Sequence, residues 1–249
     1  MNDFKIEVCS YSVRSAINAE KGGAYRVELC SGFREGGTTP SYGEIETARK
    51  NISIKLNVMI RPRGGDFIYS PVEIETMLRD IEAARKLGAD GIAAGALMPD
   101  GTVDLAAMKK IIEASAPLPV TFHRAFDCVR APFEALEAII ELGAARILTS
   151  GLKKNAPEGK ELLAGLVKQS GGRIIIMPGG GINPLNIGEL ARFTGANEFH
   201  LSGKSIIKSG MNYFNEEIDF YSYETIPGGG FVETDAAKIK SAVEMLEKI

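Results

Sequence analysis

Short apolar runs and helix-like stretches alternate along most of the chain. Four of these runs are KIEVC (5–9), IKLNVMI (54–60), PVTFH (119–123) and RIIIMP (173–178). Four others follow a Gly-Ala pair at 23–24, 88–89, 143–144 and 195–196, as expected where a glycine ends a helix before a strand. The runs are apolar on both faces, which is typical of strands in a parallel sheet that helices cover.

The eight runs predict strands that begin near residues 5, 25, 54, 90, 119, 145, 173 and 197. Their spacing of about 27 residues leaves room for one helix and two short loops between strands. Helix periodicity is clear over Pro71 to Leu87, with Ser70 as N-cap, and over 104–114 and 132–142. This alternation predicts an α/β fold, a (β/α)8 TIM barrel formed by 1–249 as a single domain. The alternative is an open doubly wound sheet, but the first strand lacks a following GxGxxG.

The chain after the eighth strand departs from this pattern. Residues 204–233 predict a long loop, and the apolar face of 234–248 predicts the last helix. The aromatic density of the loop indicates a packed lid or a subunit contact in a homo-oligomer, with a loop that only folds onto its own barrel as the alternative. The loop contains six aromatic residues: Tyr213, Phe214, Phe220, Tyr221, Tyr223 and Phe231.

Composition narrows the function classes. Hydrophobic residues make up 45% and charged residues 24% of the 249 residues, which is ordinary for a globular protein. The net charge of −3 and the lack of a Lys/Arg stripe argue against nucleic acid as a partner. The sequence shows neither a signal peptide nor an apolar stretch long enough to span a membrane. Three cysteines are too few for a disulfide framework, so we expect a soluble cytoplasmic protein with free thiols.

Candidate chemistry concentrates where strands end. In a TIM barrel the working residues lie at the C-terminal ends of the strands and in the loops that follow. Both histidines of the chain fall there, His123 after strand five and His200 in strand eight. Because imidazole titrates near neutral pH, both are candidates for proton transfer. Cys9 and Cys30 end strands one and two, and Cys128 follows strand five.

Two carboxylates lie inside apolar strands, where a lone charge is costly. Glu7 and Glu28 each precede a cysteine by two residues, so each shares a face with Cys9 or Cys30. The pattern predicts two carboxylates and two thiols at the barrel mouth, with the carboxylates as orienting or proton-accepting groups. Structural ion pairs with nearby arginines are the alternative. Asp127, after strand five, is a further catalytic candidate.

Several loops indicate a site for a small anion. Arginines and a carboxylate on a glycine-rich turn after strand three suggest a clamp, and loops seven and eight are where TIM barrels bind phosphate groups. An ion-paired rim and a tight glycine turn are the alternatives. The candidate binding residues are Arg61, Arg63, Asp66, Arg124, Gly180, Gly181, Ser202 and Gly203.

A metal site of familiar spacing is not indicated, because CxxC and HExxH are missing. The sequence does allow a site for a soft metal ion, since Cys9 and Cys30 on adjacent strands can converge on Cu(I), which prefers thiolates. The alternative is that both are small buried hydrophobic residues.

Eight motifs in order resemble the CutC copper-homeostasis family over residues 4–205. They are EVCSYS, GAYRVELCSGFREGGTTPS, NVMIRPRGGDFIYS, DGTVD, TFHRAFD, ILTSG, PGGGI and EFHLSG. The resemblance implies a cytoplasmic (β/α)8 protein that is linked to copper tolerance and binds Cu(I). It also implies copper ligation by Cys9 and Cys30. The longer aromatic segment after strand eight departs from the family pattern.

Two functions follow from these observations. The first is copper homeostasis through Cu(I) bound by Cys9 and Cys30. The alternative is an enzyme acting on a small anionic or phosphorylated metabolite, because a copper carrier has no need for the carboxylates, arginines, histidines and glycine cradle of the same rim.

Overall fold

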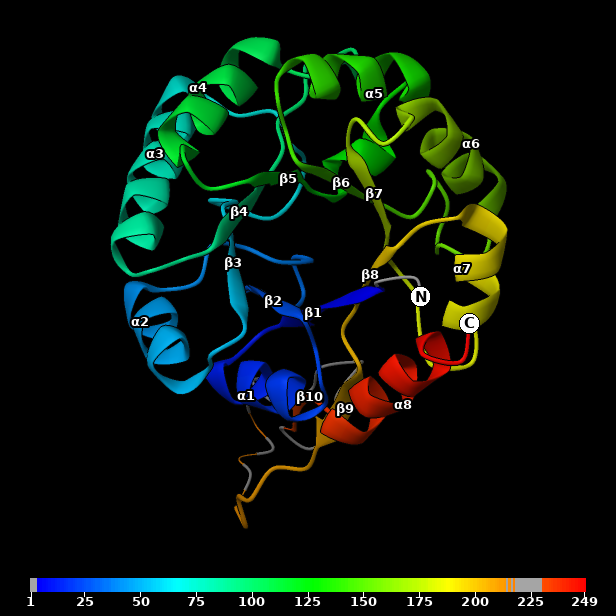
Figure 1. The fold of residues 1–249 in the computed structure, drawn as a ribbon. Helices are drawn as coiled ribbons and strands as arrows, with labels where there is room; N and C mark the ends of the chain where they lie inside the picture. Colours follow the sequence, from blue (N-terminus) through cyan, green and yellow to red (C-terminus); the bar gives the residue numbers. More distant parts are fainter. Residues whose placement is uncertain (1–3, 214, 216, 218–229) are drawn as a thin grey trace.

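The computed structural model describes residues 4–213, 215, 217 and 230–249. Eight parallel strands surround the centre and eight helices form an outer ring (Figure 1). The strands are β1 (Lys5–Ser10), β2 (Arg26–Leu29), β3 (Lys55–Met59), β4 (Gly91–Ala94), β5 (Val120–Phe122), β6 (Arg146–Thr149), β7 (Ile175–Pro178) and β8 (Glu198–Leu201). All eight begin within about two residues of the predicted positions.

The helices follow the strands one for one. They are α1 (Val13–Lys21), α2 (Tyr42–Asn51), α3 (Pro71–Lys86), α4 (Leu105–Ser115), α5 (Pro132–Glu141), α6 (Lys160–Ser170), α7 (Ile187–Thr194) and α8 (Ala236–Leu246). The predicted N-cap of α3 is confirmed: the Ser70 hydroxyl accepts a hydrogen bond from the Glu73 N–H, and the Glu73 carboxylate accepts one from the Ser70 N–H. No helix in the described residues is long and apolar enough to cross a membrane.

Strand order shows that the sheet closes. Hydrogen-bonded neighbours run β7-β6-β5-β4-β3-β2-β1-β8, and a parallel bridge between Gly179 and His200 joins the two ends. The predicted TIM barrel is therefore confirmed, and the open doubly wound sheet is excluded.

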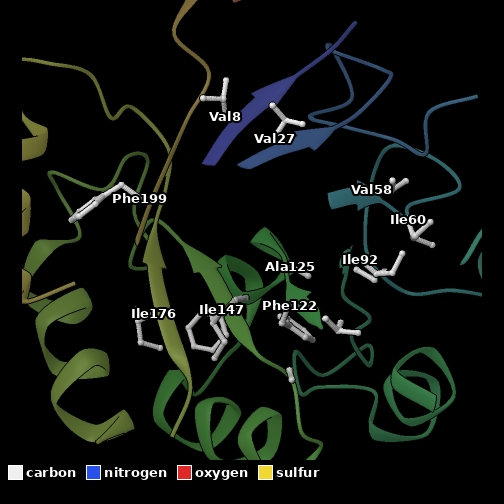
Figure 2. Close-up of a cluster of buried hydrophobic side chains, with 14 of the residues drawn as sticks. Val8, Val27, Val58, Ile60, Ile92, Phe122, Ala125, Ile147, Ile176 and Phe199 are labelled. Atoms are coloured by element: carbon white, nitrogen blue, oxygen red, sulfur yellow. The ribbon is translucent and has the colours of Figure 1, made fainter. Parts of the chain in front are cut away.

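The two faces of the barrel strands differ in chemistry. Outward side chains such as Val8, Val27 and Ile147 are buried against the helices and form the main apolar core (Figure 2). The inner face is not apolar, contrary to the sequence-based prediction. Charged and polar side chains alternate with the apolar ones along the same strands: Glu7, Arg26, Glu28, Asn57, Thr121, Arg146 and Glu198.

The segment after β8 is only partly a loop. Lys204–Ile207 (β9) and Phe231–Thr234 (β10) form an antiparallel hairpin that the sequence did not predict. Thr234 ends β10, and Asp235 caps α8, so the last helix begins two residues later than predicted. Tyr213 is exposed and Phe231 is partly so, whereas the other four aromatic residues of the predicted lid lie outside the described residues.

Candidate functional site at the barrel mouth

Two thiols meet near the C-terminal ends of β1 and β2. Cys9 Sγ and Cys30 Sγ lie 3.9 Å apart, and both side chains are buried. A hydrogen bond from the Cys30 thiol and the neighbouring His200 lower the pKa of Cys9, which favours its thiolate. The same contact and burial raise the pKa of Cys30, which stays a thiol. Cys128 is exposed and lies outside this pair.

A charged network lies deeper in the barrel. Glu7 accepts hydrogen bonds from Arg26 and Asn57, and its other oxygen lies 2.8 Å from His200 Nδ1. Burial alone would raise the pKa of Glu7, but Arg26 and His200 lower it to about 2. Arg26 also donates to Glu198 at 2.7 Å. Glu7 is thus held in ion pairs, as the structural alternative expected, in addition to its contact with His200.

Glu28 has a different state from Glu7. It is buried and contacts no arginine, with Cys30 Sγ 3.6 Å and His200 Nε2 3.8 Å from its Oε2. Oε1 has no hydrogen-bond partner among the described residues. Burial raises the pKa of Glu28 to about 8, so it carries a proton at neutral pH. Burial would lower the pKa of His200, but the negative charges of Cys9 and Glu7 and the hydrogen bonds to them raise it well above its usual value, so His200 is an imidazolium.

Charges of both signs meet in the barrel interior. The negative groups are Glu7, Glu198 and the Cys9 thiolate, and the positive groups are Arg26, Arg146 and His200. Arg61 adds a further buried cation at the cavity wall.

A cavity of about 830 Å³ opens above the thiols. Its wall combines basic groups, among them Arg124 and Lys204, with apolar and aromatic side chains such as Tyr11, Phe33 and Phe67. The cavity volume falls in the range of small-molecule sites. Both histidines and Cys9 are part of its wall, whereas Cys30 lies buried behind Cys9.

His123 is neutral and has one unused donor. Its Nδ1 accepts a hydrogen bond from the Ala125 N–H at 3.2 Å, so the proton of the neutral ring lies on Nε2. Burial and the nearby Arg61 lower the pKa of His123 to about 3. Nε2 is buried and has no partner among the described residues. Such a ring suits hydrogen-bond donation to a substrate oxygen rather than proton abstraction, a difference from the predicted acid/base role.

The predicted clamp after β3 is largely engaged within the protein. Arg61 lines the cavity, but its terminal nitrogens donate to the carbonyls of Glu35, Gly37 and Gly65. Arg63 and Asp66 pair with each other and are not in the cavity wall, and Arg63 also binds Glu73 at the start of α3. Arg63 and Asp66 thus lie away from the cavity wall, and their part in an anion clamp stays a prediction.

Arg124 lies in the cavity wall, whereas Asp127 is engaged in hydrogen bonds within the protein. Arg124 lines the cavity, donates to Asp127 at 2.7 Å and to the Ser150 hydroxyl at 3.1 Å, and keeps 45% of its side chain exposed. Asp127 accepts from Thr149, from backbone N–H groups after β6 and from Arg124. Its oxygens are engaged, so it holds the loop after β6 and is a poor candidate for catalysis.

The predicted glycine cradle lies at the cavity wall. Gly180 and Gly181 have φ of 91° and 73°, and a side chain at Gly180 would lie 3.5 Å from the Arg124 guanidinium. Ser202 and Gly203 also line the cavity. Glycine therefore allows the backbone to pass close to Arg124 at a conformation that other residues rarely adopt.

Sequence reasoning missed several residues of this site. Met59 and Tyr11 pack against the two thiols. Arg26, Arg146 and Glu198 complete the charged network. The charged residues gave a weak signal, because each is the first residue of a strand and borders an apolar run. Met59 gave none, because a methionine in a strand fits a plain core.

Two overlapping groups have the donors and spacing to hold a metal ion. Cys9, Glu28 and Cys30 place their ligand atoms within 4.8 Å of one another, and so do Glu7, Glu28 and His200. The first group is the softer, since it contains two thiols. The second is already committed to hydrogen bonds and ion pairs around Glu7.

Known proteins resemble this chain over nearly its whole length. A Parabacteroides distasonis CutC family protein is 52% identical over 96% of this chain and 98% of its own length. A Homo sapiens protein named copper homeostasis protein cutC homolog is 47% identical over 96% and 88%.

Solved structures agree with the fold. The crystal structure of the putative copper homeostasis protein CutC from Streptococcus agalactiae is 33% identical and has a TM-score of 0.77 over 80% of this chain and 98% of that one. Phosphoribosylanthranilate isomerase from Thermotoga maritima, at 13% identity and a TM-score of 0.59 over 99% of this chain and all of that one, shows the barrel fold alone. The CutC family model matches residues 4–205, and with these relatives it establishes that the chain belongs to the CutC family.

Proposed function

We propose that this protein is a cytoplasmic copper-homeostasis protein that binds one Cu(I) ion through Cys9 and Cys30. The observation that carries the proposal is the pair of buried sulfurs 3.9 Å apart at the mouth of the barrel. Thiolates are the soft ligands that Cu(I) prefers, and the human relative is named for copper homeostasis. Cys9 lines the cavity, which gives an ion a route from solvent.

Charge supports a monovalent ion at this place. Burial and the contact with Cys9 raise the pKa of Cys30, so Cys30 is the neutral thiol of the pair before binding. Exchange of the Cys30 proton for Cu(I) forms a second thiolate and adds one positive charge, which leaves the total unchanged. A divalent ion would add one uncompensated positive charge to a dry site.

Titration of the fully reduced protein with Cu(I) against a competing chelator tests the proposal. We expect one equivalent to bind and the affinity to fall at least about a hundredfold in the Cys9→Ser/Cys30→Ser variant, because serine oxygens are hard ligands. Cys128→Ser is the matched control and should bind like wild type, since Cys128 is exposed and apart from the pair. Binding below one equivalent, or equal affinity in the double variant, would refute the proposal.

The cavity supports a second candidate function, an enzyme that acts on a small organic anion. The specific observation is the neutral His123 in the wall with an unpaired Nε2–H, beside basic groups. In this proposal His123 donates to a substrate oxygen, and His200, oriented by Glu7, and the protonated Glu28 are the acid groups. Arg124, with Gly180, Gly181, Ser202 and Gly203 around it, binds the anionic end.

Anion binding separates this candidate from a copper carrier. Phosphate or ribose 5-phosphate should raise the melting temperature of wild type more than chloride at equal ionic strength, because a ligand of the folded state stabilises it by about 2.7 kcal/mol at a hundred times its dissociation constant. Arg124→Gln should lose this increment. Arg63→Gln is the control, since Arg63 has similar exposure but lies outside the cavity wall. Equal increments with chloride and phosphate would rule the anion site out.

A further inference from the structure

A third soft side chain lies next to the two thiols. The ladder between β2 and β3 pairs Glu28 with Asn57 and Leu29 with Val58, so the next step places Cys30 beside Met59. Side chains alternate along a strand, and both residues therefore share the inner face with Glu28 and Asn57. Met59 is 5% exposed and packs in one cluster with Cys9 and Cys30.

The surroundings of Gly37 show that the side chains of Met59 and Cys30 lie close together. A β-carbon added at Gly37 would lie 3.5 Å from Cys30 Sγ and 3.5 Å from the Met59 methyl carbon. The thiol and the end of the thioether chain thus border the same small space. Methionine has three rotatable bonds, so a small rotation brings its sulfur toward an ion without moving the backbone.

The separation of the thiols leaves room for a third ligand. Thiolates bind a metal such as zinc at about 2.3 Å. With bonds of about that length, sulfurs 3.9 Å apart subtend roughly 120° at a shared ion, the angle of a trigonal site rather than a linear one. Two further groups compete for the third corner, the Met59 thioether and the Glu28 carboxyl.

We propose that Met59 is the third ligand of a Cys9–Cys30–Met59 site and that it makes the site selective for Cu(I). The inference rests on the proposed Cu(I) binding by the two thiols. A thioether is a soft donor that suits Cu(I), whereas the Glu28 carboxylate is a hard oxygen donor that suits Zn²⁺. The choice between Met59 and Glu28 at the third corner therefore depends on which ion enters.

Two variants test this choice, because one should weaken Cu(I) binding and the other should weaken Zn²⁺ binding. Met59→Leu keeps the side-chain volume, and we expect it to weaken Cu(I) binding at least about tenfold while Zn²⁺ affinity stays within about twofold. Glu28→Gln should weaken Zn²⁺ binding about tenfold and leave Cu(I) within about twofold. Met108→Leu, a buried methionine of α4 outside the barrel interior, is the control and should change neither.

X-ray absorption of the Cu(I)-loaded wild-type protein tests the ligand set without any variant. Three sulfur neighbours support the inference, and two sulfurs with or without an oxygen overturn it. Equal Cu(I) affinity in Met59→Leu and wild type also overturns it, while the two-thiol site stands. If wild type binds no Cu(I), or binds it without Cys9 and Cys30, the proposed function itself fails, so the two failures are distinct.

Discussion

Replacing Arg26 with methionine should cost about 3–5 kcal/mol of unfolding free energy, the range for removing one partner of a buried ion pair. The Arg26 side chain is 4% exposed and bridges Glu7 and Glu198 across the barrel interior. Without it, Glu7 and Glu198 keep their negative charges in a site that is shielded from water. Urea denaturation at neutral pH measures the loss.

Two comparisons isolate the cause. Arg173→Met removes a pair with Glu137 in which both side chains are about half exposed, and it should cost about 1 kcal/mol or less. Adding Glu7→Gln to Arg26→Met should restore part of the stability, because it removes one uncompensated charge. A loss of about 1 kcal/mol or less for Arg26→Met would show that the network contributes no more than a surface pair.

The barrel fold of this protein can be predicted from local sequence patterns. Most strands are short apolar runs, and several helices have their own period and a side-chain cap, such as Ser70 with Glu73. Glycine at the helix ends then separates helix from strand. These signals lie within a few residues of one another, so the chain alone predicts the (β/α)8 barrel, whereas the β9 and β10 hairpin is a pairing across the residues between 207 and 231.

The site depends on relations that no local pattern contains. The thiols of Cys9 and Cys30 were predicted together because two strands repeat the same Glu-x-Cys pattern. The different protonation states of Glu7 and Glu28 were not predicted, because they depend on which cation each carboxyl group contacts. Arg26 contacts Glu7 and not Glu28. Arg26 and His200 keep Glu7 ionised, whereas burial keeps Glu28 protonated.

Loop conformation explains why the two arginines of the predicted anion clamp make different contacts. Arg61 and Arg63 are neighbours on a glycine turn, and sequence gives both the same chemistry. In the structure Arg61 turns inward and donates to three loop carbonyls, while Arg63 turns outward to Glu73. A buried guanidinium needs acceptors for its N–H groups, and the folded loop supplies backbone carbonyls before any ligand arrives.

Glu28 and His123 should give opposite pH dependences to the stability of the metal-free, reduced protein. Burial raises the pKa of Glu28 to about 8, so its contribution is fully present below pH 4.5 and is lost as pH rises toward 8. Burial and Arg61 lower the pKa of His123 to about 3, so its contribution is present above pH 6.5 and is lost as pH falls toward 3. Between pH 4.5 and 6.5 the two effects cancel in wild type.

Single substitutions should reveal the pH dependence of stability that each group causes. In Glu28→Gln nothing offsets the pH dependence that His123 causes. As the pH falls from 6.5 to 4.5, the unfolding free energy of this variant should fall by about 3 kcal/mol relative to wild type, at about 1.4 kcal/mol per pH unit. His123→Asn keeps an acceptor for the Ala125 N–H and should gain about as much over the same interval. His200 is present in wild type and in all the variants, so the titration of its unfolded form near pH 6.5 cancels in the comparison. Urea denaturation at pH 4.5, 5.5 and 6.5 measures the differences, and the double variant should run parallel to wild type. Single variants that also run parallel to wild type would show that neither group titrates as the buried geometry requires.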